Sequence, residues 1–236
     1  RATTRTPDQA PAMTLAELIE IFRERAEDTA QPYLWSDDTL LRYASEAQRQ
    51  ACIRAQLLRD STTAAICVLA VDADATDVGL SPLVLDVLKA RLDGVQQPLG
   101  ITSADQMDAD DDQWESRAAA QPTHLVLERS GAGLAGRLWP TPFEDVTLRL
   151  RVIRLPLLAA FTDGDETPEI PAQHHEQLVD WMLHLAYLKA DAETFDKDAA
   201  VNAAARFTAS FGDLPDANVR RKQADRRPNV VAFNPF

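Results

Sequence analysis

The sequence predicts an α+β protein in which N- and C-terminal helices form a helical bundle, an antiparallel β region is inserted between them, and an extended C-terminal tail follows. Apolar residues recur at helical spacing within the first sixty residues and again after residue 168. Between these segments the apolar residues alternate or form short β-rich runs bounded by glycine and proline. The expected organisation is an extended leader (1–13), a main domain (14–212, with helices in 14–60 and 168–212 and the β insert in 61–160) and the tail (213–236).

Two helices are predicted before the β region. Thr14 and Glu17 have the spacing of a capping box, and the apolar face that follows indicates a helix as far as about Asp28. Ser36 is the expected N-cap of a second helix, which runs to residue 59. The apolar face of this second helix consists mostly of small residues, which allow another helix to approach closely: Leu40, Leu41, Ala44, Ala47, Ala51, Ala55 and Leu58.

The first half of the β region contains two predicted strands. Residues 62–71 are β-rich, and residues 83–92 contain a second run that ends at the turn signal Asp93-Gly94. Residues 95–101 are therefore expected to pair back across that turn.

The second half of the β region gives clearer signals. Segments 124–129 and 134–139 flank a glycine-containing loop and predict a hairpin. Strict alternation over residues 146–152 predicts a strand with one buried and one exposed face. The acidic stretch 103–114 is expected to contain a short helix.

Two further helices are predicted after the β region. Pro168 and Pro171 mark the start of a helix over 171–193, since proline is well tolerated in a first helical turn. Its apolar face is too wide for a surface helix, so it is expected to be buried against other helices. A last helix over 196–211 should end at Gly212, the expected C-cap.

The charge is strongly acidic and unevenly distributed. The formal net charge of −13 argues against general nucleic-acid binding, which needs a basic surface. The last eighteen residues nevertheless carry about +4 and the rest about −17. An acidic body with a basic tail suggests that the tail binds an acidic partner surface.

The sequence carries no signal for a membrane or a secretory pathway. It lacks a run of about 18 apolar residues, and the first residues have no apolar core. Because the sequence does not begin with methionine, residues 1–12 are expected to be either a processed end or derived from an expression vector, and Met13 would make a natural start. Cys52 and Cys67 lie in apolar surroundings and are interpreted as reduced core thiols of an intracellular protein.

One acidic cluster resembles a calcium loop. Asp108, Asp110 and Asp112 have the opening spacing of such a loop, but Gln113 replaces the turn glycine and Ala119 occupies the twelfth position. A solvated acidic loop is the favoured interpretation, and a metal-dependent hydrolase that uses this cluster is an alternative.

Histidines and tryptophans are interpreted structurally. His175 and His184 are nine residues apart, which places them on nearly opposite sides of a helix, so His175 is assigned to packing at the helix start. Core packing is expected for the four tryptophans, with a surface or interface role as the alternative for Trp35 and Trp114. No phosphate-binding glycine loop and no nucleophile motif occurs, so no catalytic residue, metal or cofactor is predicted.

Several segments in order resemble bacteriophage head-to-tail adaptor (connector) proteins. Residues 34–49 resemble the family's N-terminal helix, and Trp114, Gln121-Pro122, the hairpin and Leu138–Pro142 are similar to its middle. Residues 146–156 resemble the strand that follows, and the helix after Pro171 closes the pattern. The resemblance extends from about residue 34 to 212, and the acidic segment 105–112 has no counterpart. The residues that carry the family signature are Trp35, Pro171, His175, Leu178, Trp181, Leu185, Ala186 and Tyr187.

This resemblance implies a structural virion protein of the head-tail neck, assembled in the host cytoplasm, rather than an enzyme. Such adaptors form a ring, usually of twelve copies, that binds the portal protein above and tail or tail-completion proteins below. DNA passes through the lumen without specific binding, and an acidic body fits that role because like charges repel across the channel. Another neck or tail-completion protein is the alternative within the same class.

The tail is the predicted partner-binding segment. A free polar linker would not need apolar residues at its end, so these residues are expected to add a short strand to a partner's sheet edge and to fill a pocket. The basic residues before them would be steered by an acidic portal or neighbouring-subunit surface. A disordered tail is the alternative. The predicted portal-binding residues are Arg220, Arg221, Lys222, Arg226, Arg227, Val230, Val231, Phe233 and Phe236.

Overall fold

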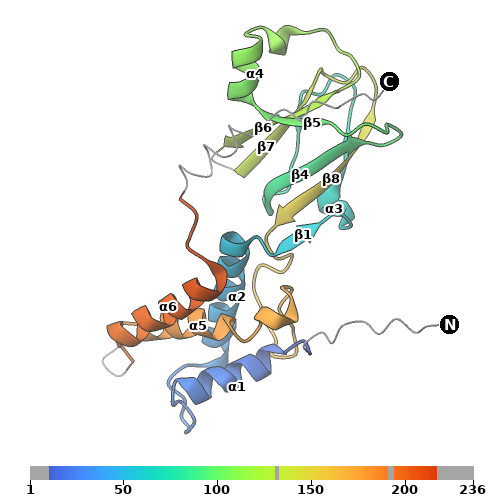
Figure 1. The fold of residues 1–236 in the computed structure, drawn as a ribbon. Helices are drawn as coiled ribbons and strands as arrows, with labels where there is room; N and C mark the ends of the chain where they lie inside the picture. The colour runs from blue at the N-terminus through green and yellow to red at the C-terminus, as the bar shows by residue number, and fades with distance from the viewer. Residues whose placement is uncertain (1–10, 131–132, 191–193, 217–236) are drawn as a thin grey trace, which may run out of the picture. The chain divides into compact units, whose positions relative to one another are not determined.

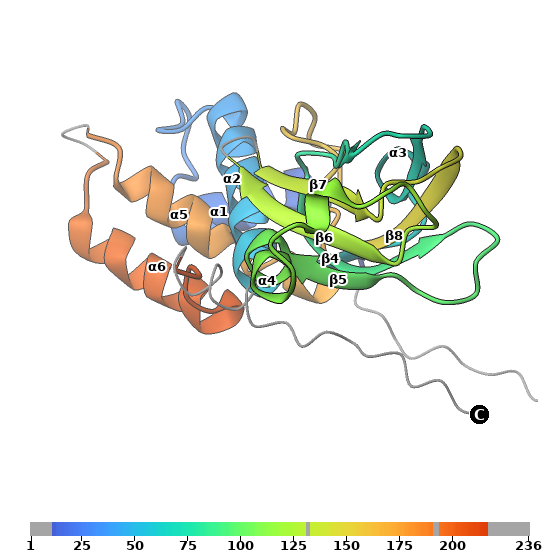
Figure 2. The same cartoon turned by 90° about the horizontal axis from the view of Figure 1, so that it is seen from above.

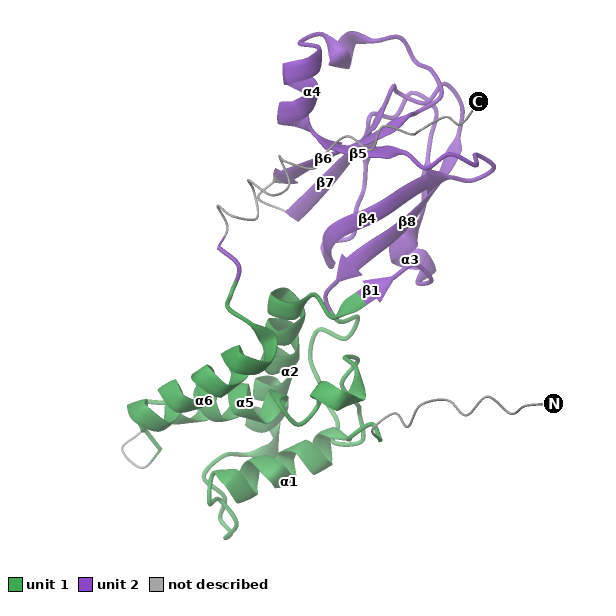
Figure 3. Ribbon diagram, in the orientation of Figure 1, with its two compact units in different colours: residues 1–58, 156–214 green, residues 59–155, 215–236 purple. Residues whose placement is uncertain are grey.

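The computed structural model describes residues 11–130, 133–190 and 194–216, and these belong to the predicted mixed α+β class (Figure 1). The chain divides into two compact units (Figure 3). The helical unit takes its described residues from 1–58 and 156–214, and the β unit contains residues 59–155. Each unit has its own set of buried side chains.

The described residues of the helical unit form four α-helices: α1 (Leu15–Arg25), α2 (Asp37–Ala55), α5 (Leu178–Tyr187) and α6 (Lys197–Phe211). Helix α5 packs against α6, α2 and α1 and is therefore central to the unit. Its Leu178, Val179 and Met182 are completely buried. The expectation that this segment is a core helix is confirmed.

The predicted caps are formed. The Thr14 hydroxyl accepts from the Glu17 N–H at 3.3 Å while the Glu17 carboxylate accepts from the Thr14 N–H at 2.8 Å, which completes the capping box. The Ser36 hydroxyl accepts from the Thr39 N–H at 3.4 Å. Gly212 is the C-cap of α6 with φ +81°, a conformation that favours glycine.

Two predicted helices are shorter than expected. Helix α2 ends at Ala55 rather than at residue 59, because Gln56 takes up a left-handed conformation with φ +51°. The segment after Pro171 forms a 3₁₀ turn, η2 (Ala172–His174), before α5 begins at Leu178, and α5 ends at Tyr187, before the predicted end at residue 193.

The side chain of His175 accounts for this irregular start of α5. Its Nδ1 accepts from the Met13 N–H at 3.1 Å, and its Nε2 donates to the Ile170 carbonyl at 2.9 Å. These bonds hold the ring between two other segments. The assignment of His175 to packing at the helix start is confirmed, since the residue is almost completely buried.

The β unit contains two sheets in its described residues. In the first sheet β1 (Leu58–Asp60) and β2 (Val68–Val71) both pair with β8 (Val146–Arg154), which also pairs with β4 (Val84–Leu92). The second sheet has the order β3-β7-β6-β5 and comprises β3 (Asp77–Val78), β7 (Gly133–Trp139), β6 (His124–Ser130) and β5 (Gly100–Ser103).

The predicted hairpin and the predicted alternating strand are both present. Strands β6 and β7 pair antiparallel from His124 opposite Trp139 to Ser130 opposite Gly133. In β8, Leu148, Leu150 and Val152 are buried, whereas Arg149 and Arg151 between them are exposed. The buried residues of β8 face the core, as the period of a strand requires.

Two expectations for the β region are wrong. The run 62–71 is not one strand, because α3 (Ala64–Cys67) precedes β2; the Asp60 carboxylate accepts from the N–H groups of Thr62 and Thr63 and turns the chain into this helix. Residues 95–101 do not pair back as a strand across the turn. Only Leu99 bridges to Ala90, while β5 pairs parallel with β6.

The parallel pair means that the insert is not wholly antiparallel. Strand β5 leads into α4 (Ala104–Asp110), and the chain then returns to β6. Such a helical crossover is the connection that parallel strands require. Ser103 favours this path because its hydroxyl caps α4 by accepting from the Gln106 N–H at 3.3 Å.

The core of the β unit lies between its two sheets. Leu148 and Leu150 of the first sheet share one buried cluster with Leu125 and Leu138 of the second. On the other side of the second sheet, α4 and the 3₁₀ turn η1 (Trp114–Ser116) supply a smaller cluster of Met107 and Trp114, packed against Val126 and Trp139. Figure 2 shows α4 beside β5 and β6. The helix thus covers the face of the second sheet that points away from the first.

Candidate functional site

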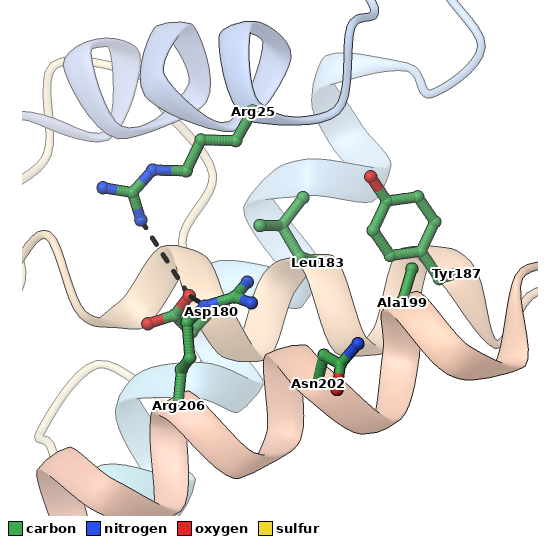
Figure 4. A pocket seen from close by; sticks show the side chains of 7 residues that line it. All are labelled: Arg25, Asp180, Leu183, Tyr187, Ala199, Asn202 and Arg206. Atoms are coloured by element: carbon green, nitrogen blue, oxygen red, sulfur yellow. Dashed lines mark hydrogen bonds and ion pairs between the residues drawn. The ribbon is translucent and has the colours of Figure 1, made fainter.

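The helical unit contains a groove. Its volume is about 610 Å³, and side chains from α1, α5 and α6 line it (Figure 4). The lining residues are Arg25, Asp180, Leu183, Tyr187, Ala199, Asn202 and Arg206. The groove therefore lies along the pair of helices that follows the β insert.

One carboxylate organises the charges of this groove. Asp180 is only 7% exposed, and its Oδ1 accepts from Arg206 Nε at 2.8 Å. The Arg25 guanidinium approaches the same oxygen at 3.9 Å and also pairs with Glu176. The positive charges of two arginines are therefore balanced by the negative charges of two carboxylates. The charged groups at the groove have no net charge.

Tyr187 forms one wall of the groove. Burial raises the pKa of its phenol, and the negative charges of Asp196 and Glu27 raise it further, so the hydroxyl stays protonated. Its ring contacts Trp35 edge-on, with centroids 6.3 Å apart. The lining of the groove thus offers both hydrogen-bond donors and apolar surface.

Arg54 fixes the point at which the chain leaves α6. Its guanidinium lies over the rings of Trp181 and Phe207, at 4.7 and 5.1 Å from their centroids. Its Nη1 donates to the Thr208 hydroxyl at 3.0 Å and to the Gly212 carbonyl at 3.3 Å. Burial lowers the pKa of this guanidinium and the charge of Asp213 partly offsets the effect. The segment that precedes the tail is therefore held to α2 by one side chain.

The residues of the family signature all lie in the helical unit. Trp35, His175, Leu178 and Ala186 are buried, Pro171 is the N-cap of η2, and Trp181, Leu185 and Tyr187 are partly buried. Trp35 joins two helices, since its ring contacts Phe22 of α1 at 5.5 Å as well as Tyr187 of α5. These residues build the core and one wall of the groove.

The surface alternative for two tryptophans is wrong. Trp35 is 2% exposed and Trp114 is 3% exposed, so both are core residues as the default interpretation has it. Both lie near the boundaries of predicted elements, where side chains are often exposed. Tertiary contacts bury them nonetheless: Trp35 against α1 and α5, and Trp114 against the second sheet.

The predicted portal-binding residues lie outside the described residues. This applies to Arg220, Arg221, Lys222, Arg226, Arg227, Val230, Val231, Phe233 and Phe236. Their proposed role therefore stays a prediction.

Two carboxylates of the acidic segment, Asp108 and Asp111, have protein partners. Asp108 accepts from the Trp114 indole N–H at 2.7 Å, and Asp111 accepts from Arg117 at 2.7 Å. The hydrogen bond from Arg117, with one from the Gln113 N–H, lowers the pKa of Asp111. Within residues 11–130, 133–190 and 194–216 no group of three or more His, Cys, Asp or Glu side chains is arranged to hold a metal ion.

The histidines and cysteines occupy separate structural positions. His184 Nδ1 donates to the Ala200 carbonyl at 2.9 Å, whereas His175 bonds to Met13 and Ile170. Cys52 in the helical unit and Cys67 in the β unit are both buried. Burial raises the pKa of the Cys67 thiol, and the nearby charge of Asp60 raises it further, so this thiol stays protonated.

Sequence reasoning missed the charged residues of the groove. Arg25, Asp180 and Arg206 come from three helices, and only the tertiary fold brings them together. The one available signal was Asp180 itself, a carboxylate between Val179 and Trp181 on an otherwise apolar helix. A buried carboxylate of this kind needs a cationic partner.

None of the described helices has the length and the apolar content needed to cross a membrane. No curated protein is matched by the chain. A family model described as SU10 adaptor protein matches residues 13–232, a range that includes every described helix and strand of both units. The match extends over far more than half of the chain, and it agrees with the order of segments from the Trp35 region to the helix after Pro171. The chain therefore belongs to the SU10 adaptor protein family, a family of bacteriophage head-to-tail adaptors.

Proposed function

We propose that this protein forms a ring beneath the portal of a phage capsid and links the portal to the tail machinery, with DNA passing through its lumen during packaging and ejection. The observation that carries the proposal is the family match over residues 13–232. Because both units and most of the tail are matched, the proposal concerns the chain as a whole and not one isolated module.

The helical unit supplies the body of the subunit in this proposal. Helices α1, α2, α5 and α6 act as a bundle, and Trp35 and Leu178 contribute to its core. In this proposal the groove around Asp180 is a binding site for a segment of a neighbouring protein. Its compensated charges favour a contact by hydrogen bonding and apolar packing over one by net charge.

The tail is the portal-binding element in this proposal. Arg54 holds the chain at Gly212, which fixes the position from which the tail starts. A fixed starting point reduces the conformational entropy lost when the following segment docks. The basic residues from Arg220 to Arg227 then supply steering, and Phe233 and Phe236 supply apolar anchors.

The acidic charge supports a passive lumen. At a net charge of −13 the subunit repels the phosphate backbone of DNA, which favours sliding over adhesion. A metal-dependent hydrolase is not favoured, because Asp108 already accepts from the Trp114 indole and the described part of the chain has no group of three or more His, Cys, Asp or Glu side chains arranged to hold a metal ion.

The proposal is tested by mixing the purified protein with the portal protein of the same phage. We expect the two to co-sediment as one large species, and negative-stain images should show an additional ring at one end of the portal. A protein that stays in the supernatant at all salt concentrations, with no ring on the portal, would refute the portal-binding role.

A further inference from the structure

The outer face of the first sheet carries a compact group of positive charges, here called the cationic face and defined by Lys89, Arg91, Arg149 and Arg151. All four side chains are exposed. They alternate with the buried residues of β4 and β8, so they share the side of the sheet that points away from the core.

The register places like charges directly opposite each other on this face. Lys89 pairs with Arg151, and Arg91 pairs with Arg149. Only Arg149 has an ion pair with a described residue, Asp93 at 2.9 Å. Opposed like charges on neighbouring strands destabilise a sheet. In a protein of net charge −13, such a group indicates a surface that an anionic partner covers.

The β unit also carries the complementary surface. The acidic segment (residues 105–112) exposes Asp105, Asp110 and Asp112, and none of these three forms an ion pair with a described residue. This segment belongs to α4 and its C-terminal end. It offers three uncompensated carboxylates against three uncompensated cations of the cationic face.

The two surfaces lie on opposite sides of the β unit. The cationic face is the outer side of the first sheet, whereas α4 covers the outer side of the second sheet through Met107 and Val126. The shared core of Leu148 and Leu125 lies between them. One copy therefore cannot bring its own acidic segment onto its own cationic face.

We propose that the cationic face binds the acidic segment of a second copy of this chain. The contact is heterologous, since each copy offers two different surfaces to two neighbours, and contacts of this kind close into a ring when the rotation between copies allows it. The proposal deepens the proposed function, on which it rests, by naming the surfaces through which neighbouring subunits meet.

A second copy fits the cationic face better than nucleic acid does. A DNA backbone would also supply anions, but the net charge of −13 on the chain repels it at longer range. A neighbouring subunit instead satisfies two uncompensated surfaces at once. Contact with a second copy would give ion-pair partners to Asp105, Asp110 and Asp112, which form no ion pair with a described residue of their own copy.

A charge-exchange experiment tests the contact between the two surfaces. The first variant carries Lys89→Glu and Arg151→Glu, and the second carries Asp110→Lys and Asp112→Lys. Self-association of each is followed by sedimentation velocity at low salt, after circular dichroism has shown that both are folded. A matched control for the first variant carries Arg42→Glu and Lys189→Glu, which change the charge by the same amount and in the same direction at exposed residues of the helical unit.

We expect the wild type and the matched control to form large assemblies that dissociate as salt is added. Each reversed variant alone should remain monomeric, because its two surfaces then carry the same sign. An equal mixture of the two variants should assemble again, since every contact between alternating copies is complementary. Recovery on mixing identifies a contact between these two surfaces and not a general effect of charge.

Three results would overturn the proposal. The variants could assemble as well as the wild type, the mixture could fail to recover, or the wild type could stay monomeric at the highest concentration reached. A first variant that assembles normally but loses affinity for duplex DNA would assign the cationic face to nucleic acid instead. None of these results bears on co-sedimentation with the portal, so the adaptor proposal is judged separately.

Discussion

The Arg154 guanidinium donates from Nε to the Asp60 carboxylate at 2.6 Å inside the β unit, and their side chains are 8% and 5% exposed. The same carboxylate accepts from the N–H groups of Thr62 and Thr63 at 2.8 and 3.1 Å. Burial would raise the pKa of Asp60, but the hydrogen bonds from Thr63, Thr62 and Arg154 outweigh burial and hold the pKa well below its usual range. The pair fastens the end of β1, the start of α3 and the end of β8 to one another.

Replacing Arg154 with methionine should strongly destabilise the β unit. The substitution leaves the Asp60 carboxylate buried without its cationic partner, and removing one member of a buried pair costs about 3–5 kcal/mol. Urea unfolding followed by circular dichroism measures the loss. Arg149→Met is the matched control, because the Arg149–Asp93 pair is exposed, and it should have a much smaller effect. Equal losses in the two variants would contradict a special role for the buried pair.

The contribution of Asp60 to the free energy of unfolding should decrease as the pH is lowered. Its pKa in the folded protein is lower than the value of about 3.9 expected in the unfolded chain, so the stabilisation is present above that value and is lost as the pH falls below it. The difference in unfolding free energy between the wild type and Asp60→Asn should therefore be constant from neutral pH to about pH 5 and shrink towards pH 2. A difference that grew on acidification would refute this assignment.

Leu183→Ala should lower the free energy of unfolding by about 2–5 kcal/mol, the usual cost of removing a buried leucine side chain. Leu183 lies on the central helix α5 and is 2% exposed. Leu188→Ala, at the C-cap of the same helix, is the control because that side chain is 44% exposed. A loss below about 0.5 kcal/mol for Leu183→Ala would show that α5 is not part of the core.

Divalent metal ions should not stabilise the protein through its acidic segment. Asp108 and Asp111 are engaged by Trp114 and Arg117, so Asp110→Asn combined with Asp112→Asn should leave the effect of calcium or magnesium on the melting temperature unchanged. Differential scanning fluorimetry with and without the ions measures this. A calcium-dependent rise of several degrees in the wild type that the double variant loses would support a metal site instead.

Deleting residues 218–236 should leave the fold intact and abolish binding to the portal. The Arg54 contacts with Thr208 and Gly212 remain in the shortened chain, so its circular dichroism spectrum and melting temperature should match those of the full chain. Phe233→Ala with Phe236→Ala should weaken co-sedimentation with portal rings even at low salt. Neutralising the arginines of the tail should matter mainly at low salt, where charges are poorly screened. Full portal binding by the shortened chain would disprove the role of the tail.

Local signals in the sequence predicted the starts of α1 and α2, the end of α6 and the hairpin correctly. A helix cap acts within one turn of the backbone, so it can be recognised from the sequence alone. This holds for the capping box of Thr14 and Glu17, for Ser36 and for Gly212. The hairpin of β6 and β7 was predictable for the same reason, since its strands are separated only by a short glycine-containing loop.

Features that depend on distant residues were not predictable. The parallel pairing of β5 with β6 follows from the crossover through α4 and from the choice of partner strand, and alternation of apolar residues determines neither. Helix α3 lies in a β-rich run because Asp60 binds the following backbone. The groove required Arg25, Asp180 and Arg206 from three helices, and their spacing along the chain gives no indication that they meet.

The neighbouring positions of β1 and β8 have a consequence for how this protein can evolve. The chain enters the β unit through β1 and leaves it through β8, and adjacent strands in a sheet lie only about 4.8 Å apart. Residues 59–155 of the β unit thus interrupt the helical sequence at a single place. An inserted unit with closely spaced ends can be enlarged, exchanged or removed with only a short loop left behind. The same helical unit can therefore carry different inserted units in different phages.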